Sequence, residues 1–343
     1  MKELKIVCVG AGYFARFHVE AWTRIDGVKL IAICDHDLAK AKALAQEFGV
    51  DKCYQTTAQA YEESSFDIID IITPPATHYD LCKEAIAHGK QIICQKPLAP
   101  TFEAATRLTK LISKSDVRFM VHENFRFQPW YRKIKELIND RAIGDQLFSL
   151  NHRMRMGDGW PDDAYMSRQP YFRQMPRLLI HETGIHFVDV FRYLLGDVTA
   201  VYSRLRKLNQ HIEGEDCGIV LFDFENGAQA IFDGNRYNES NSDNPRYTFG
   251  EMLIEGKEGS IRLLQDGSIF VQKLGAEEEE IGYTHENKNF AGDCVYFTQK
   301  HFIDCLRNGD EFETNLSDYF KSIQIQEAIY QSSEAKKEIS LIA

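Results

Sequence analysis

The sequence lacks long hydrophobic runs, paired cysteines and an excess of basic residues. No stretch approaches the ~18 apolar residues of a membrane helix, and the first apolar run starts too early to leave room for a signal peptide. The eight cysteines include no Cys-x-x-Cys pair, so neither disulfides nor a zinc site are expected. Lysine and arginine number 40 against 51 aspartate and glutamate, a net charge of −11. These absences predict a cytoplasmic protein without metal, membrane or nucleic-acid partners.

Length and hydrophobic content predict two domains. At 343 residues the chain exceeds the roughly 150 residues of a typical domain, and 44% hydrophobic residues can fill two cores. Residues 1–122 alternate strand and helix, the pattern of an α/β doubly wound parallel sheet. Residues 123–343 consist mainly of strand-like segments and turns, with a few helices. This second part is predicted to be an α+β domain with a mainly antiparallel sheet.

The first 35 residues carry a dinucleotide-binding fingerprint. The apolar run Ile6–Val9 leads into a Gly-x-Gly-x-x-Ala turn and a predicted helix. Gly10 allows the sharp turn, Gly12 leaves room for a pyrophosphate, and Ala15 allows helix and strand to pack closely. A second apolar run ends at Asp35, the spacing at which an acidic residue binds the adenosine ribose. Because its carboxylate would repel a 2′-phosphate, the predicted cofactor is NAD, with NADP less favoured.

Other candidate residues follow the ends of predicted strands, where a doubly wound sheet binds its ligands. The strand 66–72 ends at Thr73-Pro74-Pro75, and the strand 91–94 runs into Gln95-Lys96-Pro97. Pro97 restricts Lys96 to extended conformations, so this lysine could reach a bound substrate. The alternative interpretation is an ordinary surface lysine.

A predicted helix over residues 177–196 carries a second group of candidates. Glu182, His186 and Asp189 fall at i, i+4 and i+7, so an α-helix places them on one face. Structural hydrogen bonding is the alternative role for such residues. His181-Glu182 resembles the start of a zinc-binding His-Glu-x-x-His motif. The next histidine lies five residues on, roughly 140° around an α-helix, so no metal site is predicted.

These motifs resemble those of the Gfo/Idh/MocA oxidoreductases, over nearly the whole chain. The motifs that occur in the family's order are the fingerprint, Thr73-Pro74-Pro75 with His78, Gln95-Lys96-Pro97, Asn124-x-Arg126 and Glu182-x-Gly184-x-His186-x-x-Asp189. Two positions depart from the commoner pattern. Gln95 stands where many members have glutamate, and Glu182 where many have aspartate, which puts the identity of the substrate in doubt.

The resemblance implies a Rossmann domain joined to an open-faced antiparallel sheet, and hydride transfer between NAD(P) and a hydroxyl of a sugar or polyol. His186 would take the hydroxyl proton, Lys96 would stabilise the alkoxide, and Glu182 would orient the histidine or hold a substrate hydroxyl. The predicted cofactor contacts are Gly10, Gly12, Tyr13, Phe14, Asp35, Thr73, Pro74, His78, Gln95, Lys96 and Arg126. The predicted substrate contacts are Asn124, Arg155, Trp160, Arg173 and His181.

Two other functions remain open at this point. The chain could be a binding protein that senses NAD(P) or a metabolite, or an enzyme that uses bound NAD transiently for elimination or glycoside cleavage. Retention of Lys96 and His186 favours the dehydrogenase.

The segment before His186 contains five arginines and no lysine: Arg153, Arg155, Arg168, Arg173 and Arg177. Arginine's planar guanidinium suits a substrate carboxylate or several adjacent hydroxyls. The alternative is surface pairing with Asp158, Asp162 and Asp163.

The second domain is also predicted to form a homodimer or homotetramer. Val220, Phe222 and Phe224 alternate with Leu221 and Asp223, so at least one sheet face is hydrophobic. The family resemblance implies the same assembly.

Overall fold

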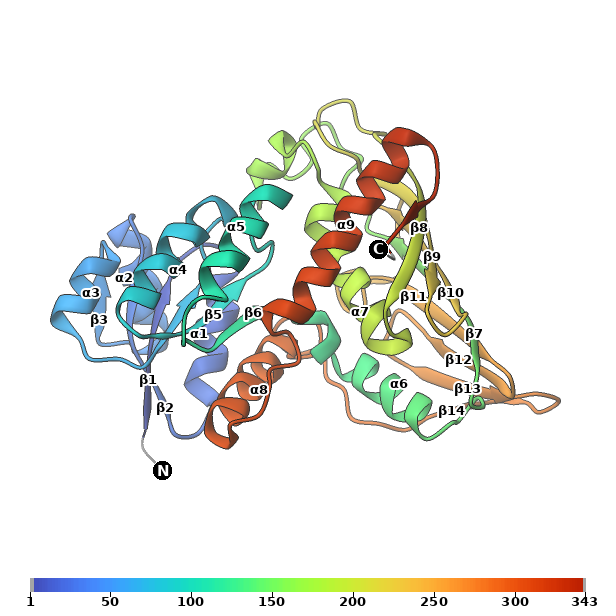
Figure 1. The fold of residues 1–343 in the computed structure, drawn as a ribbon, viewed down its shortest axis with the longest axis horizontal. Helices are drawn as coiled ribbons and strands as arrows, with labels where there is room; N and C mark the ends of the chain where they lie inside the picture. The colour runs from blue at the N-terminus through green and yellow to red at the C-terminus, as the bar shows by residue number, and fades with distance from the viewer. Residues whose placement is uncertain (1–2, 342–343) are drawn as a thin grey trace. The chain divides into compact units, whose positions relative to one another are not determined.

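The structure, a computed structural model, describes residues 3–341 and divides them into two compact units (Figure 1). The first unit contains the chain up to Asn124 together with Val295–Lys321, and the second contains Phe125–Cys294 and the chain from Ser322. The boundary expected near residue 122 lies two residues from the first division. The sequence analysis assigns the segment 295–321 to the second domain, but this segment packs in the first unit, where Phe302 and Ile303 share a core with Ile6.

The first unit is built on a parallel sheet with the strand order β3-β2-β1-β4-β5-β6 among the described residues. Its strands are β1 (Leu4–Val9), β2 (Val28–Cys34), β3 (Lys52–Tyr54), β4 (Ile68–Ile71), β5 (Gln91–Gln95) and β6 (Phe119–His122). Its helices include α1 (Ala15–Arg24), α2 (Leu38–Phe48), α3 (Thr57–Glu63), α4 (His78–Ala87), α5 (Phe102–Ile112) and α8 (Cys294–Asn308). From β1 the strand order runs outward through β2 to β3 on one side, and from β4 through β5 to β6 on the other. Such folds bind nucleotides at the point between β1 and β4 where this order switches.

Helix α2 shows how local sequence fixes an element at both ends. The Asp37 side chain accepts hydrogen bonds from the backbone N–H groups of Ala39 and Lys40, as an N-cap residue does. Gly49 ends the helix in the left-handed conformation with φ 68°, which glycine adopts without a steric penalty. The sequence predicts a helix over residues 38–48 that is closed by Gly49, and these bounds are confirmed.

The second unit contains a nine-stranded sheet within the described chain, in the order β14-β13-β12-β11-β7-β10-β9-β8-β15. Its strands are β7 (Leu147–Arg155), β8 (Val198–Arg206), β9 (Cys217–Phe224), β10 (Gln229–Asn235), β11 (Glu251–Gly256), β12 (Gly259–Leu263), β13 (Ile269–Lys273), β14 (Glu278–Glu280) and β15 (Ile339–Ser340). β7 and β10 pair in parallel, and the other neighbours pair antiparallel. The α+β class is confirmed. The turns Glu225-Asn-Gly227 and Gln265-Asp-Gly267 predict two antiparallel hairpins, and these are confirmed as β9–β10 and β12–β13.

One face of this sheet is covered by helices of the same unit, and the other is not (Figure 1). The covering helices are α6 (Pro129–Asn139), α7 (Ile185–Leu195) and the C-terminal part of α9 (Leu316–Ala335). Phe222 points toward them and contacts Phe191 of α7, with ring centroids 5.5 Å apart. On the uncovered face, Ile219 and Leu221 are 51% and 43% exposed. The uncovered face therefore carries apolar side chains as well.

Two details of the second unit differ from the sequence-based expectation. The sequence predicts a strand over residues 246–255, but β11 begins at Glu251, because Phe249 and Gly250 have φ angles of 60° and 135°, which no extended strand adopts. The sequence predicts that the acidic run Glu277–Glu280 is a solvated turn, but Glu278–Glu280 forms the exposed strand β14, in which Glu278 pairs with Arg262 of β12. Cross-strand charge pairing makes a strand possible there.

The segment expected as one helix from 177 to 196 is in fact two elements. Leu179–Gly184 forms a π-helical turn, and the α-helix α7 begins at Ile185. The α-helical spacing used to place Glu182 and His186 on one face therefore does not hold before residue 185. The same correction applies to the 140° separation calculated for His181 and His186.

No helix in the described part of the chain, residues 3–341, has both the length and the apolar character needed to cross a membrane.

Candidate active site

The turn after β1 has the geometry required of a pyrophosphate cradle. Gly10 has φ 112°, and a Cβ atom there would lie 3.0 Å from the backbone of Ile72, so only glycine fits. A Cβ atom on Gly12 would meet nothing within 4 Å, so space for a ligand lies beside this residue. Helix α1 has no side-chain N-cap, so its first backbone N–H groups are not satisfied by a capping side chain. A phosphate group suits such a helix terminus.

Asp35 ties the end of β2 to this turn. One carboxylate oxygen accepts from the backbone N–H of Ala11 at 2.7 Å, and the other accepts from Asp37 N–H at 2.8 Å. The acidic residue is therefore held beside the glycine turn, at the edge of the sheet where an adenosine ribose would lie. Together with Gly10 and Gly12, it fits the binding of NAD.

A buried chain of hydrogen bonds leads from β4 to Lys96. Trp22 Nε1 and His18 Nδ1 donate to Asp70 Oδ2 at 2.7 and 2.8 Å. The Gln95 amide lies 3.0 Å from His18 Nε2, and Gln95 Oε1 accepts from Lys96 N–H at 2.7 Å. Asp70, His18 and Gln95 are all buried. Their side chains hold the backbone of Lys96 at the carboxyl end of β5.

In this series of hydrogen bonds, the role of each group as donor or acceptor fixes the role of its neighbour. The carboxylate of Asp70 only accepts, so His18 carries its proton on Nδ1. Gln95 Oε1 accepts from Lys96, so its NH₂ group faces His18, and His18 Nε2 must be the acceptor. His18 is therefore a neutral imidazole, matched on both sides. A glutamate at position 95 would have no proton to give to His18 Nε2.

His78 supports the neighbouring loops from inside the first unit. The ring is fully buried, with Nδ1 3.0 Å from the Leu98 carbonyl and Nε2 2.8 Å from the Thr73 carbonyl. Burial lowers the pKa of His78 below its ordinary value. The structure thus places His78 as a support between the loops after β4 and β5, and its direct contact with the cofactor stays a prediction.

His186 and Asp189 lie on α7 and are fixed by residues of the short helix η2 (Phe125–Phe127). The His186 ring stacks on Phe125, with centroids 3.8 Å apart and an angle of 4° between the planes. Asp189 forms two hydrogen bonds with the Arg126 guanidinium, at 2.7 and 2.6 Å. Both members of this ion pair are buried. Arg126 thus anchors α7, while its role in cofactor binding remains a prediction.

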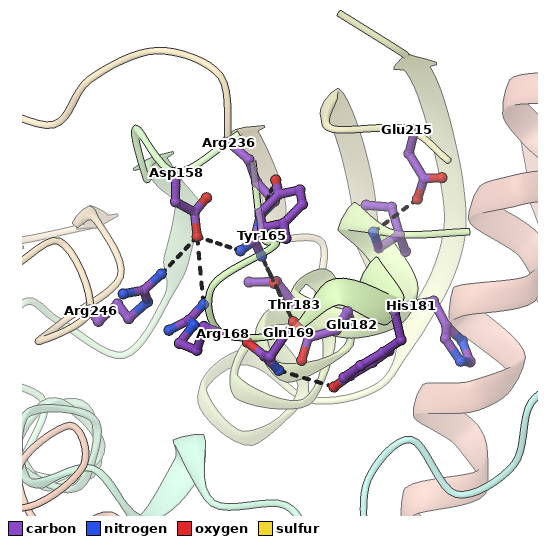
Figure 2. Close-up of polar contacts among 12 residues, drawn as sticks. Asp158, Tyr165, Arg168, Gln169, His181, Glu182, Thr183, Glu215, Arg236 and Arg246 are labelled. Carbon is purple, nitrogen blue, oxygen red and sulfur yellow. Dashed lines mark hydrogen bonds and ion pairs between the residues drawn. The ribbon is translucent and has the colours of Figure 1, made fainter. Parts of the chain in front are cut away.

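Glu182 lies in the π-helical turn beside a cluster of arginines (Figure 2). Its carboxylate accepts from Thr183 Oγ1 at 2.9 Å and lies 3.8 Å from Arg236 Nη1. Arg236 also donates to Thr183 Oγ1 and to Asp158 Oδ2, at 2.7 and 2.6 Å. Burial alone would lower the pKa of Arg236, but Asp158, Tyr165 and Glu182 raise it above its ordinary value.

The residues expected to contact substrate are not gathered in one place by the described structure. Arg155 pairs with Asp233 on the sheet at 2.6 Å, Trp160 donates to Glu239 at 2.8 Å, and Arg173 donates to the Asp162 carbonyl at 2.8 Å. His181 points toward α9, with Nδ1 3.1 Å from the Gln326 amide (Figure 2). Asn124 is buried, and its Nδ2 atom has no hydrogen-bond partner among residues 3–341.

Sequence analysis missed the residues at the centre of both networks. Asp70 gave a signal, because a carboxylate inside an apolar buried strand requires a polar partner. His18, the fourth residue of α1, could have been proposed as that partner. Asp158, Arg236 and Arg246 gave no local signal, because their association depends on how the loops of the second unit fold.

No group of three or more histidine, cysteine, aspartate or glutamate side chains within residues 3–341 is arranged to hold a metal ion.

Comparison with known proteins gives a match along the chain. The family model described as "Oxidoreductase family, NAD-binding Rossmann fold" matches residues 4–123, and the "GFO/IDH/MocA C-terminal domain" matches residues 131–262. A D-apiose dehydrogenase from Rhizobium rhizogenes is 32% identical over 97% of this chain and 96% of its own length. An inositol 2-dehydrogenase from Rhizobium meliloti is 26% identical over 97% of this chain and 98% of its own length.

Among solved structures, an oxidoreductase from Agrobacterium radiobacter in complex with NAD⁺, L-tartaric acid and magnesium is 30% identical and has a TM-score of 0.90. The match covers 99% of this chain and 98% of that chain. The glycine turn, Asp35 and the two matched domains agree with this relationship. The chain therefore belongs to the Gfo/Idh/MocA family of oxidoreductases and is an NAD-dependent dehydrogenase of that family.

Proposed function

We propose that this enzyme oxidises a secondary hydroxyl of a sugar, polyol or sugar derivative to the ketone, or catalyses the reverse reaction. The names of its relatives, D-apiose dehydrogenase and inositol 2-dehydrogenase, support this class of substrate. The observation that carries the proposal is that the two residues proposed to react, Lys96 and His186, are held in place by neighbouring side chains. Lys96 is held by a matched hydrogen-bond chain at the end of β5, and His186 is buried and stacked on Phe125.

NAD supplies the hydride acceptor. Gly10, Gly12 and the first N–H groups of α1 would hold its pyrophosphate, and Asp35 would accept from the adenosine ribose. Tyr13 and Phe14 beside the turn, and Thr73 and Pro74 after β4, are the further proposed contacts.

His186 would remove the hydroxyl proton as the carbon–hydrogen bond breaks. An imidazole suits this task because its ordinary pKa, ~6.5, lies close to neutral pH. The ammonium group of Lys96 would stabilise the negative charge that develops on the substrate oxygen. Glu182, in the π-helical turn before His186, would hold a neighbouring hydroxyl or help to orient the reacting group.

The test is turnover by the purified full-length protein. Sugars, inositols and sugar acids are offered with NAD⁺, and free NADH is followed by its absorbance. A substrate that yields stoichiometric NADH supports the dehydrogenase. Binding of NADH without turnover of any compound would favour the sensing function, and a product formed without release of NADH would favour elimination or glycoside cleavage.

The uncovered face of the second unit's sheet supports self-association into a homodimer or homotetramer. It combines exposed Ile219, Leu221 and Ile231 with the ion pair Arg153–Glu251, whose charged atoms lie 3.3 Å apart. A shallow depression of about 350 Å³ lies on the same strands, lined by Ile231, Glu251 and Leu253 among others. Large exposed apolar patches of this kind mark interaction surfaces. The variant Leu221→Glu should produce monomers in light scattering, and a wild-type monomer at micromolar concentration would rule out the assembly.

A cytoplasmic location is also part of the proposal. All eight cysteines lie in the described part of the chain and are free thiols, as is usual in reducing compartments. Cell fractionation with an antibody against the protein tests this.

A further inference from the structure

The π-helical turn Leu179–Gly184 begins without a capping side chain of its own. Its N-cap residue is Leu178, whose apolar side chain cannot accept a hydrogen bond. At the start of a helix the first four backbone N–H groups, here those of residues 178–181, lie before the first helical hydrogen bonds and need partners from outside. Without such partners, the turn that carries Glu182 would be destabilised.

The carboxylate of Glu215, in the loop between β8 and β9, points at the start of this turn (Figure 2). Its Oε2 atom accepts from Leu178 N–H at 3.1 Å, and its Oε1 atom accepts from Ile180 N–H at 3.0 Å. The carbonyl oxygen of the same residue accepts from Leu179 N–H at 2.9 Å. Glu215 is buried, so these bonds are shielded from water. One residue thus satisfies three of the four N–H groups.

The hydroxyl of Tyr330 extends this arrangement to the fourth N–H group. It accepts from His181 N–H at 3.0 Å and donates to Glu215 Oε1 at 2.6 Å, so it joins the turn to the carboxylate. Tyr330 lies on α9, and the Arg177 guanidinium covers its ring, 4.2 Å from the centroid. Glu215 and Tyr330 together therefore satisfy all four N–H groups.

A glycine lets the loop that carries Glu215 come close enough to make these bonds. A Cβ atom on Gly214 would lie 2.6 Å from the Met175 carbonyl oxygen and 2.8 Å from the Leu178 nitrogen, so a larger residue would push the backbones apart. The loop and the start of the turn therefore pack backbone against backbone. This packing places the Glu215 carboxylate within reach of the N–H groups.

His186, two residues after the turn, is fixed by contacts of its own. Its ring stacks on Phe125, and α7 is anchored by its buried ion pair with Arg126. Glu182 lies within the turn itself, directly after the four N–H groups. We therefore expect Glu215 to control the position of Glu182 more than that of His186.

We propose that Glu215 and Tyr330 are positioning residues of the active site, which hold the π-helical turn so that the Glu182 carboxylate can accept from a hydroxyl of the substrate. This inference rests on the proposed function, in which Glu182 holds a neighbouring hydroxyl, and it deepens that function by naming the residues behind the contact. Neither residue needs to touch the substrate. Their loss should weaken substrate binding through Glu182 and leave proton transfer at His186 nearly intact.

Two variants remove parts of this arrangement and keep the shape of the side chain. Tyr330→Phe keeps the ring and loses only the hydroxyl. Glu215→Gln replaces one acceptor oxygen by an NH₂ group, which cannot accept. Ser332→Ala is the matched control, because Ser332 is also buried on α9, and its hydroxyl accepts from Ser203 N–H at 2.9 Å and donates to the Lys337 carbonyl at 2.6 Å. The control removes an equivalent pair of bonds that do not involve the π-helical turn.

Turnover is followed with NAD⁺ and D-glucose, myo-inositol or D-glucuronate, one member of each class in the turnover test, and with any other member that releases NADH. Tyr330→Phe should raise the KM for the substrate about 3–10-fold, the effect of one hydrogen bond between neutral groups. Glu215→Gln should raise it roughly 10–100-fold, because its bonds involve a charged group. In both variants kcat should stay within about twofold of wild type. Ser332→Ala should change neither constant.

A double-mutant cycle with Glu182→Gln shows whether the effect passes through Glu182. If it does, adding Tyr330→Phe to Glu182→Gln should leave the KM nearly where Glu182→Gln alone puts it. Two independent effects would multiply instead, and an equal factor from Tyr330→Phe in both backgrounds would refute the inference.

Amide hydrogen exchange in peptides that cover residues 178–184 measures the hold on the turn without turnover. Exchange there should be about 10-fold or more faster in Glu215→Gln than in wild type, and unchanged in Ser332→Ala. Tyr330→Phe serves for both measurements if Glu215→Gln does not fold.

Unchanged exchange in residues 178–184, or an unchanged KM in Tyr330→Phe, would overturn the inference while leaving the dehydrogenase intact. If no compound releases NADH, the proposed function fails instead, and hydrogen exchange decides the inference alone. Faster exchange confined to residues 178–184 then supports the positioning role, and exchange equal to that of Ser332→Ala refutes it.

Discussion

Asp70 in the first unit and Asp158 in the second are both carboxylates at the centre of a network, but they receive different donors. Asp70 accepts from neutral groups, Trp22 and His18, in a fully buried chain. Asp158 accepts from guanidinium groups at a partly exposed site. The first arrangement runs through Asp70 Oδ2, His18 and Gln95 and fixes the backbone of Lys96, while the buried Asp70 Oδ1 has no hydrogen-bond partner within residues 3–341. In the second, one carboxylate oxygen accepts from Arg236 and Arg246 and lies 3.8 Å from Arg168 Nη2.

The largest expected effect is on the chemical step. Lys96→Met and His186→Ala should each lower the rate of hydride transfer about 10²–10⁴-fold, the usual contribution of a positioned acid–base group. Binding of NADH should change little, because pyrophosphate and adenosine contacts lie elsewhere. Stopped-flow rates and NADH titrations measure the two effects, with Lys83→Met on α4 as the control. Normal turnover in Lys96→Met would make this lysine an ordinary surface residue.

Removing the two central carboxylates should lower stability by different amounts. Asp70→Ala leaves the buried donors of Trp22 and His18 without an acceptor, which should lower the free energy of unfolding by about 2–5 kcal/mol. Asp158→Ala should cost less, because Arg168 and Arg246 are partly exposed and the buried Arg236 keeps its bonds to Tyr165 and Thr183. Urea denaturation of both variants tests this order. A larger loss from Asp158→Ala would contradict the distinction between the networks.

A buried histidine without a carboxylate partner provides a third case. His152 on β7 lies between Phe187 and Phe232, and burial lowers its pKa to about 3. The unfolded chain binds the proton near pH 6.5, so stability should be lost as pH falls from about 6.5 toward 3. At pH 5 the loss from this residue should approach about 2 kcal/mol. The variant His152→Phe should show a flatter profile of unfolding free energy against pH, and an unchanged slope would exclude this origin.

The smallest expected effect concerns a carboxylate that accepts only backbone N–H groups. Asp35→Asn keeps an acceptor for Ala11 and removes the charge that would repel a 2′-phosphate. The ratio of the dissociation constants for NADPH and NADH should fall about 10-fold, or ~1.4 kcal/mol. Fluorescence titrations measure both constants. Equal binding of the two cofactors by the wild type would refute the role of Asp35 in selection.

Much of the fold could be predicted because its signals are local. Gly49 marked the end of α2, proline and glycine marked strand ends, and the run Ile6–Val9 marked a strand buried on both faces. The return of residues 295–321 to the first unit could not be predicted, because an amphipathic helix does not reveal which core its apolar face joins.

The candidate site divides in the same way. Gly10, Gly12, Asp35, Lys96 and His186 stand in motifs of fixed spacing, so the sequence was sufficient to nominate them. Their supporting partners are far apart in the chain: His18 is 52 residues from Asp70, and Asp158 is 78 residues from Arg236. Long-range pairs of this kind are visible only after folding. Arg153, Arg155 and Arg177 likewise form ion pairs with Glu251, Asp233 and Glu327, which are far from them in the sequence.

The π-helical turn Leu179–Gly184 has an evolutionary consequence. A π-turn contains one residue more than an α-helical turn, so it acts like a one-residue insertion. The side chains before it are rotated by roughly 100° around the helix axis relative to those of the helix that follows. Loss or gain of a single codon in this stretch would rotate Glu182 and Thr183 away from Arg236 without turning His186 on α7. Such a change would let descendants of this gene acquire new substrates while keeping the same chemistry.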